Sequence, residues 1–459
     1  MSATEQNARM VSGGIVKEFA RFVVPSVFGL LAISSASVID GIFIGNFVGA
    51  TALASVSLVM PLLALVFGVL LMITLGGTVG AGKNLGEGNP REASNMFSKT
   101  GISVTVVLVA MALIVLVMPE KIAFALGARG ATIAMSAQYA WVIAWFFPGF
   151  GAAVLFSQFA RIDGRPGISF LGLLSITLAN VALDFIMVAW LGWGLFGAAL
   201  ATGIAYGVGA IIPLIHFLGP RSNLKLIRPY GSWFVMIRAA INGFSEFLNE
   251  ASSGLVVLLF NWVLMSQIGA MGVAAFAVVD YVVYFGILIF YGVSEGIVPL
   301  ISVNFGARKP DRIFKTLLLG IGFNTAIGAA LIALLLLWPD KLIGFFLIGD
   351  ELEIRALAVE IMSIVWPLFV FTGANIAISA YFTGMHCAKQ SSAIALMRAL
   401  VLPVGLIYLF QHWFGFMGTF YALPVSEALT FILSIVLLLW RRPQQIIDAT
   451  PVSHGQNSD

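Results

Sequence analysis

Four acidic residues stand out because each lies within a long hydrophobic stretch of the chain. They are Asp40, Asp184, Glu246 and Glu250, and none has a lysine or arginine nearby in its own stretch. A carboxylate in hydrocarbon costs several kcal/mol unless it is paired, protonated or exposed to a water-filled cavity. Chains that retain such groups use them to hold a proton, a metal ion or a cationic solute. These four residues are therefore the first candidates for chemistry.

The composition requires a lipid environment around these acids. Of the 459 residues, 60% are hydrophobic and 10% are charged, whereas a soluble globular chain carries about 25% charged residues. The first 21 residues are polar and do not predict a cleaved signal peptide. The single cysteine, Cys387, excludes an internal disulfide framework and a cysteine-based metal cluster, and the four histidines are too scattered for a metal site.

Twelve apolar runs of about 20 residues follow one another, each long enough to cross ~30 Å of hydrocarbon. We predict spans at 22–44, 52–80, 97–118, 136–160, 167–190, 195–218, 241–266, 272–300, 314–338, 357–382, 393–412 and 417–440. If the loops alternate between two sides, all but four of the 24 lysines and arginines lie on the side of the N-terminus. The exceptions are Lys121, Arg129, Lys341 and Arg355. The positive-inside rule then predicts a multi-pass protein of the plasma membrane, the inner membrane of a bacterium, with both termini cytoplasmic.

A shift of about 220 residues lays one half of the chain over the other. Asn84-Leu85-Gly86 meets Asn304-Phe305-Gly306, and Pro119-Glu120-Lys121 meets Pro339-Asp340-Lys341. A repeat of six helices preserves direction, so we predict an all-α membrane protein of two six-helix lobes related by a pseudo-twofold axis along the membrane normal. A gene duplication with no functional axis is the alternative. The predicted divisions are a cytoplasmic segment 1–21, an N-lobe 22–218, a cytoplasmic linker 219–240, a C-lobe 241–440 and a cytoplasmic tail 441–459.

The two first-lobe acids are predicted at the same depth. Asp40 lies 19 residues after Arg21, and Asp184 lies 19 residues after Arg165, which places both ~28 Å from the inner arginines. Asn180 shares a helix face with Asp184, and Tyr139 and Thr202 lie near the outer ends of their helices. All five side chains fit one polar pocket. In the alternative, Asp40 reaches the outer interface and Asp184 caps a neighbouring helix.

The second-lobe acids lie nearer the middle of the membrane. Glu246 and Glu250 are one turn apart on the seventh predicted helix, and Asp280 lies near the middle of the eighth. Two or three carboxylates this close cannot all remain charged without a counter-cation, so we predict a candidate second cation site. The alternative is that Glu246 faces water in an inner vestibule. Glu295 and Glu427 lie closer to the cytoplasmic side and are interpreted as structural.

Prolines within the predicted spans remove backbone donors and can bend the helices that contain them. They are Pro25, Pro61, Pro148, Pro299, Pro367, Pro403 and Pro424.

An ordered set of motifs over residues 15–440 resembles the multidrug and toxic compound extrusion (MATE) family. The motifs are Val38–Gly45, Gly49–Ala54, Gly80–Gly86, Asn180–Asp184, Gly192–Ala199, Ser245–Leu248, Gly269–Ala275 and Pro299–Gly306. The resemblance implies an antiporter that exports xenobiotics by alternating access, driven by H⁺ or Na⁺. The positions of Asp40, Asn180, Asp184 and Thr202 match the family's first-lobe cation site, and Tyr139 and Pro25 match an accessory residue and the first-helix bend.

For the second lobe the resemblance is incomplete. Glu250 lies about one turn from the family's acid on the seventh helix, and Thr372 or Asn375 stands where the tenth-helix acid is expected. This departure favours the first lobe for ion coupling.

We therefore predict a secondary transporter for small, lipophilic, cationic compounds rather than an enzyme. It is expected to act as a monomer in the bilayer, without nucleic acid, without a cofactor and with no metal beyond Na⁺. The rival is a flippase or exporter of a lipid-linked or other endogenous metabolite. A flippase for anionic lipids needs lysine or arginine in its cavity, and no such residue is expected within the spans. An enzyme needs clustered catalytic side chains at a membrane face, which the short loops do not offer.

Overall fold

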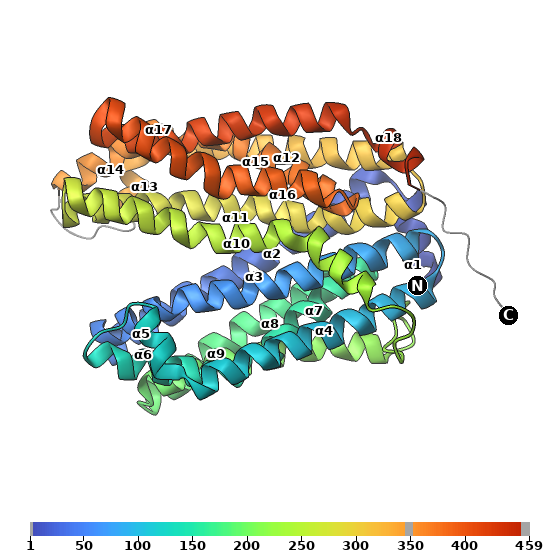
Figure 1. Ribbon diagram of the computed structural model, residues 1–459, viewed down its shortest axis with the longest axis horizontal. Coiled ribbons are helices and arrows are strands. Elements are labelled where there is room, and N and C mark those ends of the chain that lie inside the picture. Colours follow the sequence, from blue (N-terminus) through green and yellow to red (C-terminus); the bar gives the residue numbers. More distant parts are fainter. Residues whose placement is uncertain (1–2, 345–351, 451–459) are drawn as a thin grey trace.

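Long apolar runs can satisfy their backbone hydrogen bonds in lipid only as helices, and helices are what the chain forms. The computed structural model describes residues 3–344 and 352–450 (Figure 1). The first half consists of α1 (Ala3–Ser12), α2 (Ile15–Phe43), η1 (Ile44–Val48), α3 (Ala50–Gly86), α4 (Pro90–Val117), α5 (Pro119–Ala125), α6 (Ala131–Ala144), α7 (Phe147–Ile162), α8 (Pro166–Asp184), η2 (Phe185–Trp190) and α9 (Gly194–Leu218).

The second half repeats this arrangement. It consists of α10 (Phe234–Gln267), α11 (Ala270–Gly306), α12 (Pro310–Leu337), α13 (Pro339–Gly344), α14 (Leu352–Val365), α15 (Leu368–Gly384), α16 (Ala388–Leu396), η3 (Met397–Val401), α17 (Leu402–Trp440) and α18 (Pro443–Asp448). The elements η1, η2 and η3 are short π-helical segments.

Twelve membrane spans account for the helix lengths in the described chain. Nine helices are long and apolar enough to cross a membrane, and two bent pairs, α6 with α7 and α14 with α15, bring the number to eleven. The pairs bend by 51° and 54°, close to Pro148 and Pro367. The 53-residue stretch Ala388–Trp440 supplies the twelfth, since Gly415 interrupts it with a φ of +65°. The predicted spans 393–412 and 417–440 flank this glycine.

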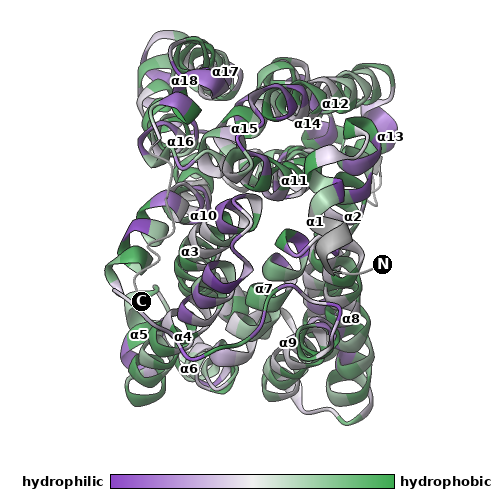
Figure 2. Cartoon of the chain, turned by 90° about the vertical axis from the view of Figure 1, so that its right-hand side faces the viewer, coloured by the Kyte–Doolittle hydropathy of each residue, from purple (hydrophilic) through white to green (hydrophobic). Residues whose placement is uncertain are grey.

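The helices pack as two bundles, the N-lobe (α2 to α9) and the C-lobe (α10 to α17). Figure 1 shows them converging at the end where α1 and α18 lie, here called the terminal end, and diverging toward the other. Seen from the terminal end, one bundle lies above the other (Figure 2). A hydrophobic cluster joins the lobes, with Val23 of α2 and Val79 of α3 packed among residues of α11 such as Ile297.

Two glycines show that the lobes meet about a pseudo-twofold axis. A Cβ on Gly86 would lie 2.0 Å from the Val303 carbonyl oxygen, and a Cβ on Gly306 would lie 1.9 Å from the Lys83 carbonyl oxygen. Gly86 and Gly306 are 220 residues apart, as are Lys83 and Val303, so the two contacts are reciprocal. Only glycine permits so close an approach of α3 and α11.

The connection between the lobes is held against the N-lobe. Lys99 of α4 donates a hydrogen bond to the Ser232 carbonyl at 2.9 Å, and the hydroxyl of Tyr230 donates to Glu92 at 2.7 Å. The first C-lobe helix begins at Phe234, seven residues before the predicted boundary at 241. At the N-terminus, helix α2 begins at Ile15, seven residues before the predicted 22, and continues through Pro25 as one helix.

Candidate functional site

Asp40 and Asp184 occupy similar places in their helices. Asp40 lies in the last turn of α2 before the π-helical segment η1, and Asp184 is the last residue of α8 before η2. A π-helical segment widens the helix locally and re-aims the side chains beside it, and such segments are frequent at functional sites. The segments η1 and η2 contact each other. Local backbone geometry therefore brings both acids to one place in the N-lobe.

The two carboxyls form a buried pair. Asp40 is 9% exposed and Asp184 is fully buried, and the two side chains lie within hydrogen-bonding reach of each other. Among the described residues, no N–H or O–H group donates a hydrogen bond to Oδ1 of Asp40 or to either carboxyl oxygen of Asp184. A proton held between the carboxyls would supply the missing donor. The burial of Asp40 and the absence of a capping contact at Asp184 in the described chain disfavour the interface-and-cap alternative.

The other three predicted pocket residues surround this pair. The Asn180 amide donates to the Thr202 hydroxyl at 3.4 Å, and Tyr139 hydrogen-bonds Thr202 and lies close to both acids. Asn180 and Tyr139 are buried. The structure thus brings Asp40, Asn180, Asp184, Tyr139 and Thr202 together, although their role stays a prediction. Tyr206, one turn after Thr202, also lies beside Tyr139 and was not predicted.

The predicted second-lobe residues are only partly assembled. Glu246 is close to Glu250, and both feel the charge of Glu295 on α11. Asp280 lies instead beside Tyr284, which is also close to Glu250. Within the described residues, no three His, Cys, Asp or Glu side chains form a group that could hold a metal ion. The candidate second cation site stays a prediction.

The expectation that the spans contain no lysine or arginine is wrong. Arg161 of α7 and Arg398 of η3 have side chains that are 3% and 8% exposed. Arg161 pairs with Glu295 across the two lobes, and Arg398 lies 3.7 Å from Glu427. Sequence reasoning assigned both arginines to the cytoplasmic side because their partners lie 134 and 29 residues away. Glu295 and Glu427, interpreted as structural, are those partners.

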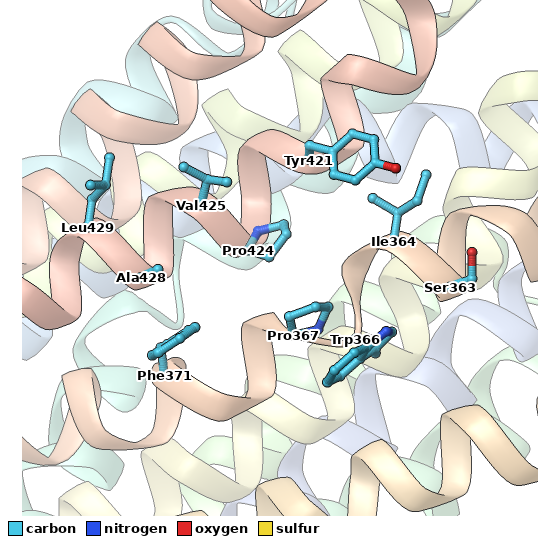
Figure 3. A pocket seen from close by; sticks show the side chains of 10 residues that line it. All are labelled: Ser363, Ile364, Trp366, Pro367, Phe371, Tyr421, Pro424, Val425, Ala428 and Leu429. Atoms are coloured by element: carbon cyan, nitrogen blue, oxygen red, sulfur yellow. The ribbon is translucent and has the colours of Figure 1, made fainter. Parts of the chain in front are cut away.

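A cavity of about 500 Å³ lies elsewhere in the C-lobe, where the bend between α14 and α15 faces α17. Figure 3 shows Trp366 and Pro367 at the bend opposite Tyr421 and Pro424 of α17. Its lining is predominantly apolar, and none of the candidate acids contributes to it. This cavity is therefore separate from the carboxyl pair.

Known proteins resemble the chain over nearly its whole length. The MatE family model matches residues 25–186 and 246–409. The multidrug export protein MepA of Staphylococcus saprophyticus is 25% identical over 98% of this chain and 99% of its own length. A structure of MATE in complex with MaL6 has a TM-score of 0.89, and an outward-facing multidrug resistance MATE family transporter of the MOP superfamily has 0.87. Both are 20% identical and cover 96% of this chain and 98% of their own, which shows the shared fold.

Proposed function

The chain belongs to the MatE, or multidrug and toxic compound extrusion, family, and on that premise we propose that it exports small lipophilic cations in exchange for protons. The observation that carries the proposal is the buried Asp40–Asp184 pair. The multidrug export activity in the name of its relative MepA supports the substrate class. The protein acts by this proposal as a monomer in the plasma membrane, without a cofactor.

The proton chemistry follows from the proximity of the two carboxyls. Two negative charges within hydrogen-bonding reach repel strongly at low dielectric, so the buried pair holds at least one proton between Asp40 and Asp184. Opening the pocket to water would hydrate the carboxylates and permit release, and closing it would favour recapture. The pair therefore exchanges protons in step with the conformation of the N-lobe.

The arrangement of the lobes supports alternating access. The reciprocal Gly86 and Gly306 contacts and the Arg161–Glu295 pair close the inter-lobe space at the terminal end. If that end is cytoplasmic, as the positive-inside rule predicts, the structure corresponds to an outward-facing state. Separation of the lobes at the terminal end and closure at the opposite end would then give the inward-facing state.

The buried arginines do not favour the flippase alternative. An anionic lipid headgroup needs a cation that is available to it, and Arg161 and Arg398 each have a glutamate partner. The acids near the lobe interface, Glu246 and Glu250, favour a cation instead. Sodium coupling at these acids remains the alternative to protons.

The test is transport by the purified protein in liposomes, with tetraphenylphosphonium as the cationic probe. An imposed pH gradient should drive uptake in wild type, and Asp40→Asn should abolish that uptake while retaining probe exchange at equal pH. The matched control is Asp280→Asn, which removes a membrane acid outside the pair and should retain most activity. Uptake driven only by a Na⁺ gradient would reject proton coupling, and normal pH-driven uptake by Asp40→Asn would reject the site.

A further inference from the structure

Arg398 is a buried cation on which four C-lobe elements converge. It lies in the π-helical segment η3, and its guanidinium donates to the Asn249 side-chain oxygen of α10 at 3.0 Å and to the Tyr291 hydroxyl of α11. Glu427 of α17 lies 3.7 Å from the same guanidinium. Because the side chain is 8% exposed, its positive charge is compensated by protein groups rather than by water.

The carboxylate that faces Arg398 has further polar partners on α15. The Asn375 amide donates to Oε2 of Glu427 at 2.8 Å, and Thr372 also hydrogen-bonds this carboxylate. The remaining oxygen of Asn375, Oδ1, is buried and accepts no hydrogen bond in the described chain. Removing the guanidinium would therefore leave several oxygen atoms around an uncompensated charge.

The corresponding region of the N-lobe is built with the opposite polarity. At an offset of 220 residues, Asp40 corresponds to Phe260, which is fully buried and stacks on Phe276 at 4.7 Å between ring centroids. Arg398 corresponds to Leu178, and Glu427 corresponds, at an offset of 221, to Tyr206. The N-lobe thus carries two acids without a basic partner, and the C-lobe carries an acid with an internal cation.

We propose that Arg398 acts as a tethered cation that permanently fills a cation site in the C-lobe and so keeps that lobe from binding a transported ion. The site consists of Glu427, Asn375, Thr372, Asn249 and Tyr291. It follows that the C-lobe contributes a fixed charge to the transport cycle and that the exchanged ion is confined to the N-lobe.

The ligand that this site would take without the guanidinium is a small monovalent cation such as Na⁺. Carboxylate, amide and hydroxyl oxygens are the ligands that hard cations prefer. One added positive charge is what Glu427 needs, because breaking a buried pair leaves an uncompensated charge whereas replacing it restores neutrality. The guanidinium and a bound Na⁺ should therefore exclude each other.

The test measures cation-specific stabilisation of the purified full-length protein. Melting temperatures are compared in NaCl and in N-methylglucamine chloride at equal ionic strength. Wild type and Arg398→Lys should melt at the same temperature in both salts. Arg398→Met should melt several degrees higher in NaCl, because a ligand that binds the folded state stabilises it, and Arg398→Met/Glu427→Gln should lose this difference.

The outcomes separate this inference from the proposed transport function, on which its meaning for ion coupling rests. A folded Arg398→Met protein with no Na⁺-specific shift would overturn it, as would a Na⁺-specific shift in wild type that Glu427→Gln removes. The wild-type measurement applies even if Arg398→Met does not fold. Melting requires no transport, so failure of the Asp40→Asn transport test leaves this result unaffected.

Discussion

Gly86 of α3 and Gly306 of α11 each pack against the main chain of the other's helix, across the boundary between the two lobes. The two residues correspond in the internal repeat, so a single pair of contacts expresses both the duplication and its pseudo-twofold axis. The closeness of this approach makes the glycines part of the closure at the terminal end. Side chains added here should act on the conformational equilibrium rather than on the carboxyl pair.

Gly86→Ala and Gly306→Ala should each separate the lobes at the terminal end, with similar effect. The new methyl group would meet a backbone oxygen, and overpacking of this kind costs about 1–3 kcal/mol. Spin labels on the exposed positions Arg91 and Lys309, in a Cys387→Ser background, report the separation by electron–electron resonance. Gly322→Ala is the control, because that helical glycine has open space around it. Unchanged distances in both variants would contradict this role.

The Arg161–Glu295 pair should contribute to the same closure. Arg161→Met leaves a partly buried carboxylate without its cation, so we expect a lower melting temperature and a longer label distance. Adding Glu295→Gln should restore much of the loss, with a coupling free energy on the order of 1–3 kcal/mol in the double-mutant cycle.

The exposed Arg355–Asp340 pair provides a control for this cycle. Its side chains are 40% and 69% exposed, and exposed pairs contribute about 0–1 kcal/mol. Arg355→Met should therefore have little effect on melting. Additive losses in the Arg161→Met/Glu295→Gln protein would show that the inter-lobe pair carries no coupling.

Cys387, in the connection between α15 and α16, should react slowly with N-ethylmaleimide. Burial raises the pKa of its thiol from 9.0 to about 11, with Arg441 opposing the change. At pH 7.5 the thiolate fraction is then roughly 100-fold below that of the unfolded chain, and thiolate is the reactive form. The labelling rate of folded protein should rise about tenfold per pH unit up to pH ~10. Equal rates in folded and detergent-unfolded protein would contradict this burial.

The raised pKa of Cys387 also has a sign for stability. The folded state retains the thiol proton to higher pH than the unfolded state, so this contribution is present below pH 9 and is lost as pH rises through about 11. Cys387→Ser removes the group and should flatten the alkaline part of a stability profile. A profile unchanged by this substitution would show that the thiol is not linked to unfolding.

The sequence predicted features that depend on composition and local spacing. Apolar runs indicated the spans, and Gly415 lies between two of them because a glycine with positive φ turns the chain where the hydrophobic pattern pauses. The depth of Asp40 and Asp184 followed from residue counts along rigid helices. These inferences hold because helix geometry fixes position per residue.

The sequence did not predict features that depend on long-range pairing. Nothing near Arg398 indicates that Glu427 and Tyr291 will surround it, so its hydrophobic context suggested a loop boundary. The π-helical segments after Asp40 and Asp184 leave no clear sequence signature, since each reads as an ordinary helical continuation. The seven described residues before α2's predicted start are likewise helical because they pack against the protein rather than because they are apolar.

Proton release on substrate binding tests the central claim most directly. Tetraphenylphosphonium is added to purified protein in weakly buffered solution, and a pH indicator reports the protons released per bound probe. Wild type and Asp280→Asn should release protons, whereas Asp40→Asn and Asp184→Asn should bind the probe with little or no release. Release by both pair variants equal to that of wild type would contradict the assignment of the exchanged proton to Asp40 and Asp184.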